Sequence, residues 1–241
     1  MLVLAIDTSN RALTVALATP QQLLGEVTLN VKQTHSDGLM PALTYLFKAT
    51  KKVPADLDRV VVAQGPGSYT GIRIAVTTAK TLAWTLNKAL VGISSLAVIA
   101  SNVLEQGRLI VPLFDARRNA VFTGAYQWQE GRLVNILADR HVALGDWLEQ
   151  LAATKKPVTF VGDTAVFSDQ LTAALGGRAE IASAACALPR GSQLAALGSQ
   201  LTPVTNVHSF VPTYLRMTEA EANWLKEHPA NEGHEPYVEE I

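Results

Sequence analysis

The chain has 241 residues, of which 48% are hydrophobic and 17% charged, and its formal net charge is −1. This length suffices for one large domain or two small ones with a hydrophobic core. The near-neutral charge and the lack of a basic cluster argue against tight nucleic-acid binding by this chain alone. The low charged fraction predicts that part of the surface is buried in an assembly.

The cysteine content and the N-terminal run indicate the compartment. A single cysteine, Cys186, cannot form an internal disulfide and fits a reducing cytoplasm. The run Met1–Asp7 lacks the positive lead of a signal peptide, and no apolar run is long enough to span a bilayer. We therefore expect a cytoplasmic protein that does not contact a membrane.

The first half of the chain predicts a three-stranded meander followed by alternating helices and strands. Apolar and β-branched runs predict the strands, and apolar residues at helical spacing predict the helices. We expect Ser36 or Asp37 to cap the first helix, Thr70 to cap the second, and Pro41 to lie in a first turn. The expected strands are 2–6, 12–18, 22–29, 59–63 and 90–94, and the expected helices are 35–48, 70–87 and 95–104.

The pattern restarts at Arg108. The runs Leu2–Asp7 and Leu109–Asp115 are both apolar strands that end in an aspartate, and a four-residue polar turn and a second strand follow each. The expected strands of this half are 109–115, 120–126, 133–137 and 157–162, and the helices are 145–153, 164–175 and 191–201. An extended stretch at 210–216, a short amphipathic helix at 219–227 and a loose tail at 228–241 complete the chain.

We interpret this internal repeat of about 100 residues as a duplicated α/β fold made of two β-meander–α–β subdomains. The predicted boundaries are 1–105 for the first subdomain and 106–216 for the second, with the short helix and tail at 217–241. Two such halves would place a cleft between the hairpins that carry Asp7 and Asp115.

A glycine-rich turn joins the strand at 59–63 to the long helix. Gly65, Gly67 and Gly71 bracket this turn, and such turns place free backbone N–H groups at a helix N-terminus, where an anion can bind. The alternative is a tight connection without a ligand, because three glycines are a weak signal. Ser68 does not fit a hydrolase nucleophile, since the required second glycine is replaced by Thr70.

Asp7, Gly65, Gly67, Ser68 and Asp115 form a candidate vestigial anion or nucleotide site. Neither hairpin turn contains the glycine that would let the backbone approach a phosphate, and two arginines fill the second turn. The alternative is that both aspartates hydrogen-bond their own turns. We therefore expect no cofactor.

Histidine spacing does not predict a metal site. A helical metal-binding pair needs two histidines four residues apart, and the position four residues after His35 is Leu39.

The long helix after the glycine-rich turn has an unusual outer face. One side carries the apolar stripe that includes Ile72, Ala75 and Ala79, whereas the other holds few charges and one tryptophan, Trp84. This pattern predicts a helix covered on two sides, by its own sheet and by either a partner or another helix of the chain.

Five blocks of sequence resemble the TsaB (YeaZ) family, and the resemblance runs over almost the whole chain. The most specific block is Gln64–Arg73, with the sequence QGPGSYTGIR. The other blocks are Ala5–Ser9, His35–Ser36, Asp115–Arg118 and Pro212–Arg216.

The resemblance implies an actin-like/Hsp70-like duplicated fold without a competent catalytic site. It also implies a scaffold role in the bacterial synthesis of N6-threonylcarbamoyladenosine beside the tRNA anticodon. The implied partners are the catalytic subunit TsaD and the ATPase TsaE, with tRNA contacted only through the complex. The catalytic relative carries a histidine pair on its first helix, of which this chain matches only His35.

The resemblance further implies that the helices at 36–50 and 70–87 pack against the same pair from TsaD, or from a second copy of the chain when TsaD is absent. An active actin-like ATPase or kinase and a self-associating module without a link to tRNA are the alternative functions. The implied interface residues are His35, Leu39, Leu43, Leu46, Arg73, Val76, Ala79, Lys80 and Ala83.

Overall fold

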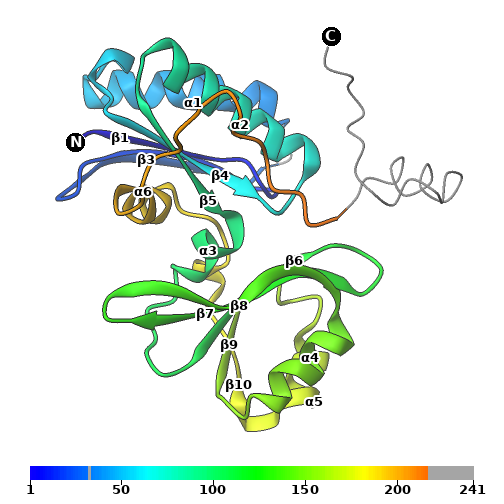
Figure 1. Cartoon of the computed structure of the whole chain (residues 1–241). Helices are drawn as coiled ribbons and strands as arrows, with labels where there is room; N and C mark the ends of the chain where they lie inside the picture. The colour runs from blue at the N-terminus through cyan, green and yellow to red at the C-terminus, as the bar shows by residue number, and fades with distance from the viewer. Residues whose placement is uncertain (32–33, 217–241) are drawn as a thin grey trace, which may run out of the picture.

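Two five-stranded mixed sheets form the frame of the molecule (Figure 1). The computed structural model describes residues 1–31 and 34–216. The strand order is β3-β2-β1-β4-β5 in the first sheet and β10-β9-β6-β7-β8 in the second. Read from β8 to β10, the second sheet therefore has the same order as the first sheet read from β3 to β5. The predicted duplicated α/β fold is confirmed.

The elements of the first half follow the predicted order. Its strands are β1 (Val3–Asp7), β2 (Leu13–Ala18), β3 (Leu23–Leu29), β4 (Arg59–Gly65) and β5 (Ala89–Ser94). Its helices are α1 (His35–Thr50), α2 (Tyr69–Thr85) and α3 (Ser95–Ala100), with a 3-10 turn at Pro54–Asp56.

The elements of the second half repeat this order up to a C-terminal extension. Its strands are β6 (Leu109–Asp115), β7 (Ala120–Gln129), β8 (Arg132–Ala143), β9 (Val158–Gly162) and β10 (Ala179–Ile181). Its helices are α4 (Leu144–Ala153), α5 (Ser168–Leu175) and α6 (Gly191–Ser199), with 3-10 turns at Gly176–Arg178 and Ala184–Cys186.

Helices cover both faces of the first sheet (Figure 1). α1 packs on β2 and β3, and α2 packs on β4, whereas α6 crosses β1 and β2 on the opposite face. Strand β1 is buried along its whole length because both of its faces are covered. One apolar cluster lies under α1 and α2, and a second lies under α6.

The short helix α3 lies where the two halves meet. Leu96 and Ile99 of this helix pack with Ile110, Phe114 and Tyr126 of the second sheet. A second core, around Trp147 and Phe160, lies between that sheet and helices α4 and α5. The junction therefore has a continuous apolar core.

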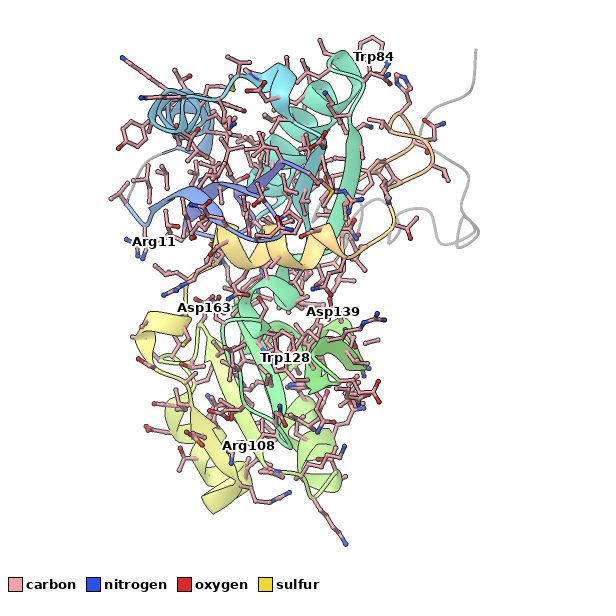
Figure 2. All side chains as sticks on the ribbon, turned by 90° about the vertical axis from the view of Figure 1, so that its left-hand side faces the viewer. Arg11, Trp84, Arg108, Trp128, Asp139 and Asp163 are labelled. Carbon is pink, nitrogen blue, oxygen red and sulfur yellow. The ribbon has the colours of Figure 1, made fainter. Side chains whose placement is uncertain are left out.

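A partly buried polar cluster at the same junction is centred on Asp139, which Figure 2 labels between the two halves. Ser94, the N-cap of α3, and Tyr126 both donate hydroxyl hydrogen bonds to this carboxylate. The Asn135 side-chain amide donates a third bond of 3.0 Å. Burial, aided by the Asp139 charge, raises the pKa of Tyr126, so this hydroxyl stays protonated and can donate.

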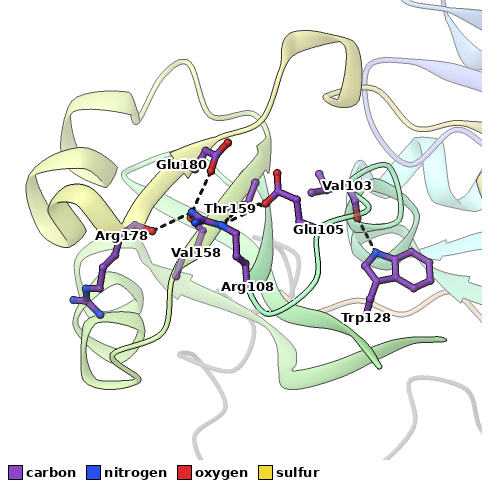
Figure 3. Close-up of polar contacts among 8 residues, drawn as sticks. All are labelled: Val103, Glu105, Arg108, Trp128, Val158, Thr159, Arg178 and Glu180. Carbon is purple, nitrogen blue, oxygen red and sulfur yellow. Dashed lines mark hydrogen bonds and ion pairs between the residues drawn. The ribbon is translucent and has the colours of Figure 1, made fainter. Parts of the chain in front are cut away.

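Arg108 connects neighbouring strands of the second sheet on its β10 side (Figure 3). Its guanidinium donates to Thr159 Oγ1 at 2.8 Å and to the Val158 carbonyl at 2.9 Å. It also forms ion pairs of 3.4 Å with Glu105 and Glu180. One side chain thereby connects β6, β9 and β10.

Several element boundaries differ from the prediction. β8 extends over 132–143 rather than 133–137, because it pairs with β7 along a long hairpin. α3 ends at Ala100, and α5 begins at Ser168 after a turn at 164–167. The edge strand β10 was not predicted, since only three residues pair with β9.

The predicted helix starts are also corrected. The N-cap of α1 is Thr34, so Pro41 lies in the second turn of this helix rather than the first. The N-cap of α2 is Ser68, whose Oγ accepts the Gly71 N–H at 3.3 Å, and not Thr70.

The segment from Gly191 to Arg216 returns to the first half. α6 packs on the first sheet, and the Thr213 N–H donates to the Gln64 carbonyl at 2.8 Å. Helix α6 of this segment thus packs on the first half, although the predicted second subdomain, 106–216, includes it. The expected helix at 219–227 and tail at 228–241 lie outside the described residues. Across 1–31 and 34–216, no helix is both long and apolar enough to cross a bilayer.

Candidate functional site

The aspartate of the first hairpin, Asp7 at the turn between β1 and β2, is buried. Asp7 is fully buried at the end of β1, and its Oδ1 accepts the Ser9 N–H at 2.7 Å. Its Oδ2 is buried without a hydrogen-bond partner in the part of the chain that the structure describes. Burial is the main cause that raises the pKa of Asp7, while the Ser9 N–H and the nearby His35 act in the opposite direction.

The raised pKa of Asp7 predicts a pH-dependent stability. In the folded protein the Asp7 carboxyl stays protonated at pH values above its ordinary pKa of 3.8. Ionising it costs folding free energy, so the protein loses stability as the pH rises from 3.8 through the raised pKa. Each unit of the shift corresponds to about 1.4 kcal/mol. Urea unfolding of wild type and Asp7→Asn at several pH values should show wild type losing stability relative to the variant over that range. A difference that does not change with pH would contradict this assignment.

The glycine-rich loop is packed against the first hairpin. A Cβ on Gly67 would lie 2.1 Å from the Ser9 carbonyl oxygen, and one on Gly71 would lie 2.1 Å from that of Thr8. The Ser68 N–H donates to the Ser9 carbonyl at 2.6 Å. The glycines are therefore required for close contact between two parts of the chain, and an N–H group expected for an anion is already used.

The second hairpin repeats the aspartate turn of the first. Asp115 Oδ1 accepts the Arg117 N–H at 2.7 Å, as Asp7 does from Ser9. The alternative interpretation, that both aspartates bond their own turns, is thus confirmed. Asp163 Oδ2 accepts the Asp115 N–H at 3.0 Å. Partial desolvation and the Asp115 charge raise the pKa of Asp163, although this hydrogen bond opposes them.

An open cleft of about 1530 Å³ separates the two hairpins. Gly67, Ser68 and Asp115 line it, whereas Asp7 and Gly65 of the predicted anion site do not. The structure therefore brings together only three of the five predicted residues. Asp7 is fully buried and does not line the cleft.

The cleft also contains residues that sequence reasoning did not select. Arg11 and Asp163 lie on opposite sides of the junction in Figure 2, and Arg216 donates to the Ala116 carbonyl at 3.1 Å. Asp163 directly follows β9, and its position at the end of a strand is visible in the sequence, where we expected a helix cap rather than a catalytic role.

Six predicted interface residues lie in the protein's own core. These side chains are at most 3% exposed because α1 and α2 turn their apolar stripes toward the first sheet. They are therefore not available to a partner, and this part of the prediction is corrected. The six are Leu39, Leu43, Leu46, Val76, Ala79 and Ala83.

The three polar residues of the predicted interface have different environments. His35 Nε2 is 2.7 Å from the Asn10 carbonyl oxygen, at the edge of the cleft. Lys80 Nζ donates to the carbonyls of His208 and Phe210, which ties the returning segment to α2. Arg73 is exposed and lies 5.2 Å from the Tyr69 ring centroid, so it remains on the surface.

The exposed sides of α1 and α2 carry large apolar residues. Met40 is 56% exposed, Tyr45 65% and Trp84 63%. The neighbouring surface of α2 is formed by small uncharged residues such as Thr77 and Thr81. Exposed apolar residues in a weakly charged surface are typical of protein contact sites.

Within the described ranges, no group of three or more His, Cys, Asp or Glu residues is arranged to hold a metal ion.

Comparison with known proteins assigns the chain to a family. The family model described as "TsaD: tRNA N6-adenosine threonylcarbamoyltransferase" matches residues 22–224. The tRNA threonylcarbamoyladenosine biosynthesis protein TsaB of Bacillus subtilis is 44% identical over 227 residues, which cover 94% of this chain and 99% of that relative. The chain belongs to the TsaB (YeaZ) family. The TsaB protein of Escherichia coli is 27% identical over 132 residues, 54% of this chain and 57% of its own length.

Two solved structures share the fold of this chain. YeaZ from Pseudomonas aeruginosa superimposes with a TM-score of 0.73 at 24% identity, covering 89% of this chain and 99% of that one. A second crystal structure, of a protein with similarity to peptidase YEAZ from Pseudomonas aeruginosa, gives a TM-score of 0.75 at 24% identity with the same coverage. The expected resemblance to the TsaB family is confirmed, and the fold extends over both halves.

Proposed function

We propose that this chain is a non-catalytic scaffold subunit for threonylcarbamoyl transfer to the adenosine beside the tRNA anticodon. It binds and supports a TsaD-type catalytic subunit, together with a TsaE-type ATPase, in the cytoplasm, and meets tRNA only through that complex. The observation that carries the pathway assignment is the 44% identity to a TsaB protein over nearly the full length of both chains.

The packing at the cleft supports a subunit without a catalytic site of its own. A phosphate-binding loop needs backbone N–H groups that are open to the ligand. Here the glycine-rich loop packs on residues 8 and 9, and Asp7 is buried. Calorimetric titration of the isolated chain with ATP and magnesium should show no binding in the micromolar range. Micromolar binding would favour the alternative of an active actin-like ATPase or kinase.

The outer face of α1 and α2 supports the proposed docking surface. These helices lie on the side of the first sheet opposite to the second half, so nothing in the described chain covers Met40, Tyr45 and Thr81 (Figure 1). The same face would pair two copies of this chain when the catalytic subunit is absent. A self-complementary contact of this kind is usual in dimers with twofold symmetry.

Charge introduced on this face is expected to break the complex. Tyr45→Glu or Thr81→Glu should weaken binding of a TsaD-type subunit at least about tenfold, because burying an unpaired carboxylate in an interface costs more than about 1.4 kcal/mol. Light scattering of the mixtures gives the mass of the complex, and titration gives the affinity. Gln150→Glu on α4 is the matched control, because it adds the same charge in the second half next to Arg140.

Loss of the chain should also remove the product of the pathway. Cells depleted of this protein should lose threonylcarbamoyladenosine from their tRNA, and the wild-type gene should restore it. Normal levels of the modified nucleoside after depletion would contradict the proposed pathway, independently of the binding results.

A further inference from the structure

The charges of this chain are distributed unevenly on the two sides of Arg216. Residues 1–216 contain 19 of the 20 basic residues and 14 of the 21 acidic ones, a net charge of +5. Residues 217–241 contain Lys226 and seven glutamates, a net charge of −6. Acidic terminal segments of this kind often bind basic surfaces. The glutamates are Glu219, Glu221, Glu227, Glu232, Glu235, Glu239 and Glu240.

The cleft between the two halves has a basic lining. Four arginines from three separate segments line it, against two carboxylates. The two carboxylates, on Asp115 and Asp163, already accept backbone N–H groups. The lining is therefore suited to additional negative charge. The arginines are Arg11, Arg117, Arg118 and Arg216.

Two of these arginines are available for a new contact. The side chains of Arg11 and Arg117 are exposed and have no hydrogen-bond or ion-pair partner among residues 1–31 and 34–216. They come from the two hairpins, so a ligand that meets both must lie across the cleft. Arginine binds carboxylates through charge-assisted hydrogen bonds, often in pairs.

The size of the cleft favours a polypeptide over a small ligand. Its volume of about 1530 Å³ exceeds the range of roughly 300–1,000 Å³ that is typical of small-molecule pockets.

The acidic segment starts at the cleft itself. Thr213, Tyr214, Leu215 and Arg216 line its wall, so the described part of the chain ends at the cleft. The remaining 25 residues can span roughly 80 Å when extended, which is ample for this purpose.

We propose that the acidic C-terminal segment, residues 217–241, binds in the arginine-lined cleft of its own chain. Its glutamates pair with Arg11 and Arg117 and so connect the two hairpins. This proposal does not depend on the docking of a catalytic subunit, because the cleft and the outer face of α1 and α2 are different surfaces.

A spin label on the segment tests the proposal in the full chain. The label is attached to Gly233→Cys in a Cys186→Ser background, and the broadening of backbone amide signals is measured by NMR. The amides of residues 10–11 and 116–118 should broaden, whereas those of α4 should not. Broadening should be lost when salt rises from about 0.1 M to about 1 M, because the Debye length falls from about 10 Å to about 3 Å.

Charge variants identify the contact. Replacing Glu232, Glu235, Glu239 and Glu240 with glutamine should abolish the broadening. The double variant Arg11→Gln, Arg117→Asn should do the same, since asparagine tolerates the positive φ of 66° at residue 117. The matched control, Lys52→Gln with Lys156→Gln, removes two exposed cations away from the cleft and should leave it unchanged. Thermal melting confirms that each variant is folded.

Three outcomes would overturn the proposal. The first is the absence of broadening at the cleft amides in the wild-type background. The second is broadening that appears only between chains, when spin-labelled and isotope-labelled copies are mixed. The third is that the cleft amides are not broadened by the labelled segment, but their NMR signals shift on addition of a short single-stranded RNA. That result would indicate a site for phosphodiesters.

Discussion

Gly71→Ala is expected to destabilise the protein by roughly 3 kcal/mol, at the upper end of the usual cost of overpacking. The added Cβ would lie 2.1 Å from the Thr8 carbonyl oxygen, which belongs to a buried hairpin turn and cannot move aside. Thr8 Oγ1 also donates to the Gly71 carbonyl at 2.7 Å, so separating the two segments would weaken this buried hydrogen bond as well. Urea unfolding followed by circular dichroism measures the effect.

Gly145→Ala is the matched control for this change. Gly145 also lies in the first turn of a helix, α4, but no atom within 4 Å would meet its Cβ. Alanine should therefore stabilise this helix by about 0.5–1 kcal/mol, because glycine loses more backbone entropy on folding. Opposite signs at the two positions separate the clash from helix propensity, and equal effects would show that the hairpin is not held by close packing.

The duplicated fold could be predicted because its signal is local. Each half begins with an apolar strand that ends in an aspartate, and the structure gives both aspartates the same hydrogen bond to the second residue after them. The two meanders and their parallel fourth strands follow from the same alternation of apolar runs and polar turns. A pattern that appears twice in one chain is hard to produce by chance.

The return of residues 191–216 to the first half could not be predicted, since it depends on contacts between distant segments. α6 has two leucines and two alanines among its nine residues, and nothing in its sequence specifies which sheet it covers. In the structure Gly198 lies against Val61, where a Cβ would be 2.2 Å from the valine side chain. Such complementarity becomes visible only when both partners are placed.

Prediction of the candidate sites was also limited, because the sequence does not show which distant segments are in contact. An apolar stripe shows that a helix face is buried, but it does not show by what, and the stripes of α1 and α2 are buried by their own sheet. The residues suited to a partner are the exposed ones between the stripes, such as Tyr45. Likewise, the glycines of the loop predicted a close backbone approach correctly, yet the approaching group is the chain's own hairpin rather than a phosphate.

Ala79→Glu is expected to unfold the protein or to cost at least about 3 kcal/mol, because it places an unpaired carboxylate in the apolar core. Ala79 has no exposed surface and packs in the cluster beneath α1 and α2. Thermal melting of this variant should show a large fall in midpoint or no cooperative transition at all.

The same substitution two residues earlier separates folding from docking. Thr77 is exposed on α2, so Thr77→Glu should change the stability by no more than about 0.5 kcal/mol. On the proposed docking face it should nevertheless weaken binding of a TsaD-type subunit by about tenfold or more. A folded Ala79→Glu protein would contradict the assignment of α2's apolar stripe to the core. A Thr77→Glu protein that binds as wild type does would instead place the docking surface away from this side of the helix.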